Sequence, residues 1–121
     1  MLKHEEITAK ILEACFEVSK ELGAGFLESV YQNALVIALK QKGLQVQVQV
    51  PIAVRFRGEN VGNFVADLLV EQKVIVELKA VGALVPEHQA QVINYLKATG
   101  VEVGLLVNFG RPKIEYHRLH K

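Results

Sequence analysis

The chain has 121 residues, half of them hydrophobic, and a formal net charge of +1. A chain of this length forms one domain, and its near-neutral charge argues against tight non-specific binding to duplex nucleic acid, which draws on many phosphate contacts. Its longest apolar runs are far shorter than the ~20 residues that span a bilayer. Residues 1–6 lack the apolar core of a signal peptide, so we expect a cytoplasmic protein with no membrane partner.

Two helices are predicted at the N-terminus. The first spans about Glu5 to Leu22, where apolar residues recur on one helical stripe, and the second runs from about Leu27 to Lys42. The sequence Gly23-Ala24-Gly25 separates them, and Gly43 ends the second. The single cysteine, Cys15, has no partner for an internal disulfide. It lies on the apolar stripe, which predicts a small buried residue rather than a reactive thiol.

An extended region comes after the helices. Residues 44–50 alternate strictly between apolar side chains and glutamine, which predicts a half-buried strand with glutamine on its outer face. Pro51 marks a break or bulge, residues 52–57 continue extended, and residues 58–60 form a turn. Because uncharged glutamines do not protect an exposed strand edge from pairing, we hypothesise that this strand pairs with a second copy in a homodimer.

The next two segments are typical of a β-hairpin. Residues 64–70 and 74–80 are short, apolar and rich in β-branched side chains, and they flank the polar triplet Glu71-Gln72-Lys73. The hydrophobic pattern favours a register in which Val70 pairs with Val74.

Two acidic residues, Asp67 and Glu77, lie directly opposite each other in that register, with Cβ atoms roughly 4.5–5.5 Å apart. Carboxylates this close repel each other, so the hairpin is strained, holds a proton between them, or binds a divalent cation. Lys79 projects from the same face, because it lies two residues beyond Glu77. An ordinary salt-bridged cluster on a half-exposed sheet face is the alternative.

The other face of the hairpin is predicted to be wholly apolar, with Phe64, Ala66, Leu68, Val70, Val74, Val76, Leu78 and Ala80.

A third helix is predicted to begin at Pro86 and to be capped by Gly100. His88, Gln91 and Tyr95 recur at i, i+3 and i+7 and share one stripe. This composition is unusual for a solvated face, which favours lysine, glutamate and arginine. A partly exposed polar stripe with Tyr95 packed at its edge is the alternative.

Two strands complete the chain, a buried one at residues 101–109 and a short last one at residues 114–119. The order of elements predicts an α/β sandwich with a mixed central sheet, in a single domain over residues 1–121. Arg55 and Arg57 on one strand form a modest basic patch, as a nucleic-acid binder requires, or a solvated edge.

The order of these residues resembles a known group of enzymes. The spacing Gly25-x-x-Glu28-x-x-Tyr31 is the signature of the GxxExxY proteins. The later motifs resemble the PD-(D/E)xK nuclease superfamily, with Asp67, then Glu77-x-Lys79, then Gln91-x-x-x-Tyr95 on a helix. That last element resembles the RecB-like and Cas4-like branch. The resemblance covers residues 7–118 and departs from the pattern at Ala66, which stands where the motif has proline.

The resemblance implies a restriction-endonuclease-like αβββαβ core and a nuclease that cleaves DNA or RNA with Mg²⁺ or Mn²⁺. It implies that Asp67 and Glu77 bind the metal directly, with the backbone carbonyl of Leu78 as a third ligand. Glu28 would bind through water or complete a second metal position, and Lys79 would assist the attacking water. The residues expected to bind substrate or support the ligands are Tyr31, His88, Gln91 and Tyr95.

Two other functions stay open at this point. A catalytically silent module could bind nucleic acid or a protein on the same fold, although the four intact charged residues argue against a degenerate site. A metal-dependent enzyme acting on a small phosphate compound would also suit a chain with little basic surface. Because the chain has no visible specificity domain, a partner protein that supplies specificity is a further hypothesis.

Overall fold

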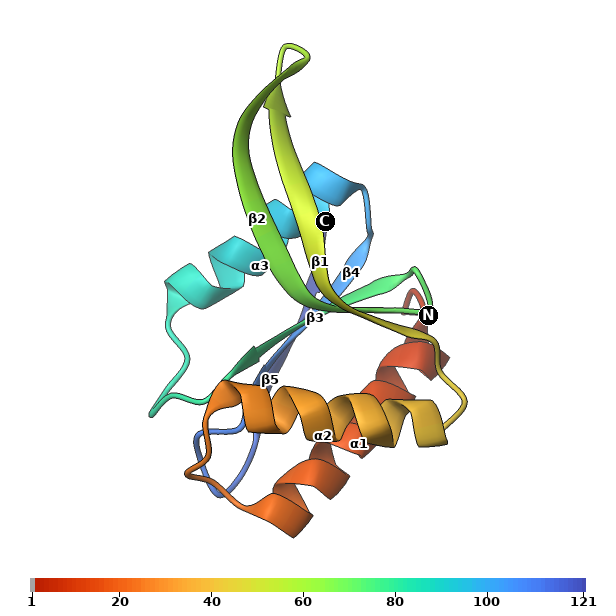
Figure 1. Ribbon diagram of the computed structural model, residues 1–121, viewed down its shortest axis with the longest axis vertical. Coiled ribbons are helices and arrows are strands. Elements are labelled where there is room, and N and C mark those ends of the chain that lie inside the picture. Colours follow the sequence, from red (N-terminus) through yellow and green to blue (C-terminus); the bar gives the residue numbers. More distant parts are fainter. Residues whose placement is uncertain (1) are drawn as a thin grey trace.

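The computed structural model describes residues 2–121, which form three layers of helices and sheet (Figure 1). The elements in chain order are α1 (Glu5–Leu22), α2 (Glu28–Gln41), β1 (Val46–Phe56), β2 (Glu59–Val70), β3 (Val74–Lys79), α3 (Pro86–Thr99), β4 (Val103–Asn108) and β5 (Glu115–His120). This order confirms the predicted α/β class with an αβββαβ core and a mixed sheet. None of the helices in the described range has the length and apolarity needed to cross a membrane.

The five strands are arranged in the order β1-β2-β3-β4-β5, and all neighbours are antiparallel except β3 and β4, which are parallel. Parallel neighbours need a crossover connection, which α3 supplies. The predicted pairing of Val70 with Val74 is confirmed, and the β2–β3 ladder ends at Leu68 and Val76. Strand β3 is buried from its first residue to Leu78, so a polar side chain on it is surrounded by core.

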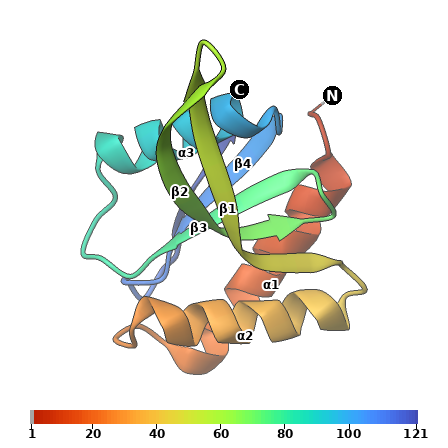
Figure 2. The ribbon, with the colours of Figure 1, turned by 45° about the horizontal axis from the view of Figure 1, so that its top comes forward.

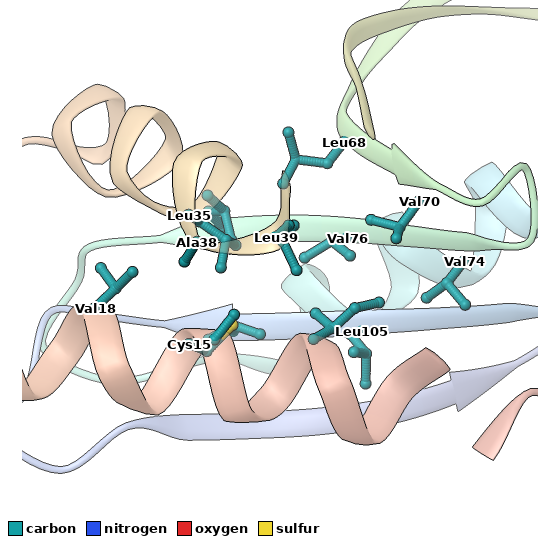
Figure 3. Close-up of a cluster of buried hydrophobic side chains, with 14 of the residues drawn as sticks. Cys15, Val18, Leu35, Ala38, Leu39, Leu68, Val70, Val74, Val76 and Leu105 are labelled. Carbon is teal, nitrogen blue, oxygen red and sulfur yellow. The ribbon is translucent and has the colours of Figure 1, made fainter. Parts of the chain in front are cut away.

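Helices cover both faces of the sheet, with α1 and α2 on one face and α3 on the other (Figures 1 and 2). Figure 3 shows the larger core, in which side chains of α1 and α2 meet those of β2, β3 and β4. It contains Cys15, which is fully buried as predicted and whose burial raises the pKa of the thiol. A smaller core on the α3 side consists of Ile52, Ala66, Ile75, Tyr95 and Leu96.

The break predicted at Pro51 is wrong. Strand β1 continues through Pro51, which pairs with Val65. A proline is tolerated there because β1 is an edge strand, where one N–H faces away from the ladder. The irregularities of β1 lie on either side of Pro51: Gln49 has a φ of 51°, and the register against β2 shifts between Val54 and Arg55. The turn is also shorter than predicted, because only Arg57 and Gly58, both with positive φ, separate β1 from β2.

The prediction of a wholly apolar hairpin face is also wrong for the first residues of the hairpin, Phe64 and Ala66. Leu68 and Val70 belong to the larger core, but Ala66 belongs to the smaller core on the α3 side, and Phe64 is 46% exposed. Residues two apart on a regular strand share a face, so Ala66 and Leu68 are separated by a break in the alternation. That break falls at Asp67, which the β1–β2 ladder passes over. Beyond it, residues 52–64 project from the sheet as a two-stranded arm (Figure 1).

Asn108 ends β4 as a fully buried amide. Its Oδ1 accepts hydrogen bonds from the N–H groups of Val81 at 3.0 Å and Gly110 at 2.9 Å. Its Nδ2 donates to the carbonyl of Val81 at 2.9 Å and to Oε1 of Glu115 at 3.0 Å. A side-chain amide offers two donors and two acceptor positions, so this one is saturated. The bonds fix the chain at Val81, two residues after β3 ends at Lys79.

Replacing Gly110 with alanine tests this close approach. An added Cβ would overlap the backbone nitrogen and oxygen of Val81. We expect Gly110→Ala to lower the free energy of unfolding by about 2–3 kcal/mol in chemical denaturation, as overpacking does. The control is Gly82→Ala in the loop that contains Val81, where an added Cβ meets no atom within 4 Å, and its expected change is within about 0.5 kcal/mol. Equal stability of the two variants would contradict the close approach.

Candidate active site

Asp67 on β2 and Glu77 on β3 are hydrogen-bonded to each other's strand. The N–H of Asp67 donates to Oε1 of Glu77 at 2.7 Å, and the N–H of Leu78 donates to Oδ2 of Asp67 at 2.8 Å. These bonds begin where the β2–β3 backbone ladder ends. Side-chain oxygens therefore replace backbone carbonyls as the acceptors, and both carboxylates are fixed at the point where the two strands separate.

The pairing of β3 with β4 determines which way the backbone of Leu78 faces. The N–H of Phe109 donates to the carbonyl of Lys79 at 2.8 Å, so the backbone of Lys79 is bonded to β4. Backbone groups of successive strand residues point to alternate sides, and the N–H and C=O of one residue point to the same side. Those of Leu78 therefore point away from β4. Its N–H bonds Asp67, and its carbonyl lies on that same side.

Glu77 is a carboxyl group in an apolar environment, only 4% exposed. Burial raises its pKa most, the negative charge of Asp67 raises it further, and together they bring the pKa to about 7. The N–H of Asp67 and the positive charge of Lys79 act in the opposite direction and only partly offset the shift. Two full negative charges on Asp67 and Glu77 are therefore unfavourable at neutral pH. This agrees with the repulsion that the sequence predicts between the two carboxylates.

The other acidic groups respond to the same set of charges. Burial raises the pKa of Asp67, and the N–H of Leu78, the charge of Lys79 and the side-chain amide of Gln49 oppose the rise. Burial also raises the pKa of Glu28, while the charge of Lys79 lowers it. The charges that interact in one cluster are those of Glu28, Asp67, Glu77 and Lys79.

The loop before α2 sets the position of Glu28, the first residue of that helix. Gly25 has a φ of 113°, a conformation that favours glycine. The hydroxyl of Tyr31 donates to the carbonyl of Gly23 at 2.6 Å and accepts from the N–H of Phe26 at 3.2 Å. Because its ring is fully buried and its hydroxyl is bonded to the loop, Tyr31 supports the helix that presents Glu28.

The three polar residues of the α3 stripe lie in different environments, and two of them interact with charges of the cluster, His88 with Glu28 and Tyr95 with the two carboxylates. His88 accepts a hydrogen bond at Nδ1 from the N–H of Val85 at 3.1 Å, which places the proton of a neutral ring on Nε2. Tyr95 is buried, and its pKa is raised by burial and then by the charges of the two carboxylates. Gln91 is half-buried, one turn before Tyr95.

A groove of about 790 Å³ lies between the arm and α3. The rings of Phe64 and Tyr95, one from each side, are 6.0 Å apart. The two carboxylates do not line this groove, but Gln91 and Tyr95 line it and Tyr95 responds to their charges. We call this space the arm groove; its principal lining residues are Arg55 and Phe64 on the arm and Gln91, Asn94, Tyr95 and Lys97 on α3.

Sequence reasoning missed Gln49 and Asn108. Gln49 resembles the other glutamines of β1, and nothing in the alternation indicates that its amide acts on Asp67. Asn108 did give a signal, because it is the polar residue of an otherwise apolar strand, as Asp67 is the polar residue of the apolar segment 64–70. No sequence pattern indicated the arm groove, because the groove depends on the break in strand alternation at Asp67.

The oxygen atoms at this site suit a hard divalent cation. Asp67 and Glu77 each use one oxygen on a strand amide, which leaves Oδ1 and Oε2 for a ligand, and the carbonyl of Leu78 is a neutral third oxygen. A cation would also compensate the charge that raises the pKa of Glu77. Within residues 2–121, no three His, Cys, Asp or Glu side chains are gathered as a complete ligand set. An ion here would therefore keep several waters, as Mg²⁺ does in proteins.

The raised pKa of Glu77 makes metal-free stability depend on pH. The folded state keeps the proton up to a pKa of about 7, whereas the unfolded state releases it near 4.5, the ordinary pKa of a glutamate, so stability falls as pH rises between those values. We expect Glu77→Gln to remove this slope and to raise the free energy of unfolding above pH 7 by roughly 2–3 kcal/mol.

Thermal and urea unfolding in EDTA across this pH range measure the effect. Glu59→Gln is the control, because Glu59 is an exposed carboxylate on β2 far along the arm. The same pH slope in wild type and Glu77→Gln would contradict the assignment of the proton to Glu77.

Comparison with known proteins agrees with this geometry. A sequence profile described as the PD-(D/E)XK nuclease superfamily matches residues 5–119. Among solved structures, the crystal structure of SSO0001 matches with a TM-score of 0.61 at 19% identity, covering 77% of this chain and 49% of that one. This chain thus spans about half the length of that protein, and the likeness is one of fold. No match was found among curated proteins. Because the profile covers nearly every element described above, the chain belongs to the PD-(D/E)XK nuclease superfamily.

Proposed function

We propose that this protein is a metal-dependent nuclease that hydrolyses phosphodiester bonds of DNA or RNA. Members of its superfamily are generally nucleases and typically use divalent metals. The main support from the chain itself is the reciprocal bonding of Asp67 and Glu77, with Lys79 acting on the same charges. We also propose a place among the GxxExxY proteins, in the RecB-like and Cas4-like branch, on the motifs of residues 25–31 and 91–95.

In this proposal Asp67, Glu77 and the carbonyl of Leu78 hold Mg²⁺ or Mn²⁺, and Glu28 binds through water or completes a second metal position. Such an ion, when bound, lowers the pKa of a water molecule and offsets negative charge on the phosphate. Lys79 orients the attacking water and stabilises the negative charge that develops in the transition state.

Three residues of α3 contribute to substrate binding in this proposal. Gln91 and Tyr95 contact the sugar–phosphate backbone or support the ligands, since both line the arm groove and Tyr95 responds to the charges of the two carboxylates. His88 has Nε2 free to meet a phosphate oxygen while Nδ1 caps the helix.

A cleavage assay with Mg²⁺ and with Mn²⁺ tests the proposal on single-stranded, duplex, branched and RNA substrates. We expect wild type to cleave at least one of them. Asp67→Asn and Lys79→Met should each lower the rate by about 100-fold or more, because each removes a charge that acts on the reacting groups.

Two matched substitutions serve as controls. Glu59→Gln removes an exposed carboxylate from the same strand as Asp67, and Lys73→Met removes an exposed lysine from the hairpin that carries Lys79. Both should cleave as wild type does. Cleavage that survives Asp67→Asn and Lys79→Met would overturn the assignment of the site. Binding without cleavage would favour the silent module, and activity on nucleotides but not polymers would favour the small-phosphate enzyme.

We further propose that the protein forms a homodimer through β1. This strand is at an edge of the sheet, and Gln47 and Gln49 on it and Gln45 directly before it are all exposed. Val48 on the same strand is 49% exposed. Pro51 lacks an N–H and Gln49 has a positive φ, so pairing with a second copy would use mainly the residues before Gln49.

Sedimentation at tens of micromolar protein tests the homodimer. We expect wild type to sediment as a dimer and Val48→Lys to sediment as a monomer, because a charge on the pairing edge opposes strand addition. Val61→Lys, which changes a similarly exposed valine on the arm, should leave the dimer intact. A wild type that remains monomeric at this concentration would refute the homodimer.

A further inference from the structure

We propose that the arm groove binds a single-stranded segment of nucleic acid, with one base stacked on Phe64; this inference rests on the proposed function, whose substrate it specifies. The groove has about 790 Å³, within the range of pockets that enclose small ligands, and such a space takes part of one strand rather than a duplex. Its aromatic side chains, its cations and its position each support this occupant.

Phe64 offers an aromatic surface to the groove. The residue is 46% exposed, and the centroid of its ring lies 6.0 Å from that of Tyr95 across the groove. Gly62 leaves room for it, since a Cβ there would lie 3.2 Å from the Phe64 ring. Stacking of a base on an aromatic side chain accepts any base, because every base has a π-face.

The polar groups of the groove suit a phosphate backbone. Arg55 on the arm and Lys97 on α3 supply a cation on each side, and Asn94 adds an amide on the helix. Glu87 also lines the groove at the first turn of α3, so the net charge of the lining is +1. The modest charge suits a strand held by stacking and two phosphate contacts, rather than non-specific binding of duplex.

The groove lies beside the candidate site. Tyr95 lines the groove and also packs in the smaller core with Ala66, the residue directly before Asp67. A strand that lies between Phe64 and α3 is therefore led past Tyr95 toward the two carboxylates. The groove would act as the part of the substrate site that selects an unpaired strand.

Fluorescence anisotropy with a labelled twelve-nucleotide oligothymidylate, in EDTA so that no cleavage occurs, tests the inference. We expect wild type to bind this probe at least about tenfold more tightly than a duplex of the same length. Phe64→Ala should weaken binding about tenfold, and Phe64→Trp, which keeps a stacking surface, should restore it. Arg55→Gln should reduce the slope of log affinity against log salt by about 0.7, the value for one phosphate contact on a single strand.

Val61→Ala is the matched control, because Val61 is an exposed apolar residue on the same strand that does not line the groove. It should bind as wild type does. The inference is overturned if Phe64→Ala binds as Val61→Ala does, if the duplex binds as tightly as the oligothymidylate, or if wild type does not bind the oligothymidylate.

The binding assay and the cleavage assay separate this inference from the proposed function. Phe64-dependent binding by a protein that cleaves nothing would support the groove and refute the nuclease. Cleavage that depends on Asp67 and Lys79, together with unchanged binding by Phe64→Ala, would support the nuclease and refute the groove.

Discussion

The exchange of hydrogen bonds between Asp67 and Glu77 is the interaction on which the other features of the site depend. It takes the place of backbone pairing at the end of the β2–β3 ladder, so the two strands separate there. From that point β2 changes the face it presents and continues into the arm, which forms one wall of the arm groove. The same bonds hold Glu77 in a buried position and Asp67 in a half-buried one, and burial raises the pKa of both carboxyl groups.

Other hydrogen bonds fix the backbone beside the two remaining members of the charged cluster, Glu28 and Lys79. Tyr31 holds the loop before α2 and with it the helix end that carries Glu28. Asn108 holds Val81, just beyond the end of β3 that carries Lys79. Saturated polar networks of this kind are rigid, and reacting groups benefit when the residues behind them do not move.

Much of the fold could be predicted because its signals are local. The apolar stripes gave the helices, and the β-branched segments flanking a polar triplet gave the register of Val70 with Val74. The charged residues could be identified for the same reason, since charges stand out in apolar strands. The predictions that failed depended on contacts between distant residues: Phe64 and Ala66 turn to the α3 side because Asp67 bonds to β3, and strand alternation contains no trace of that bond.

The backbone N–H of Leu78 has an unusual hydrogen-bond partner for a residue in a buried central strand, because the acceptor is a side chain. The N–H groups around it in β3 are protected by neighbouring strands, whereas this one is bonded to the carboxylate of Asp67 alone. Its exchange with solvent deuterium therefore reports on the state of one side chain rather than on the opening of the sheet. In a heteronuclear spectrum of isotope-labelled protein, the Leu78 resonance would act as a built-in probe of protonation and ion binding at Asp67, without a fluorophore or a substrate.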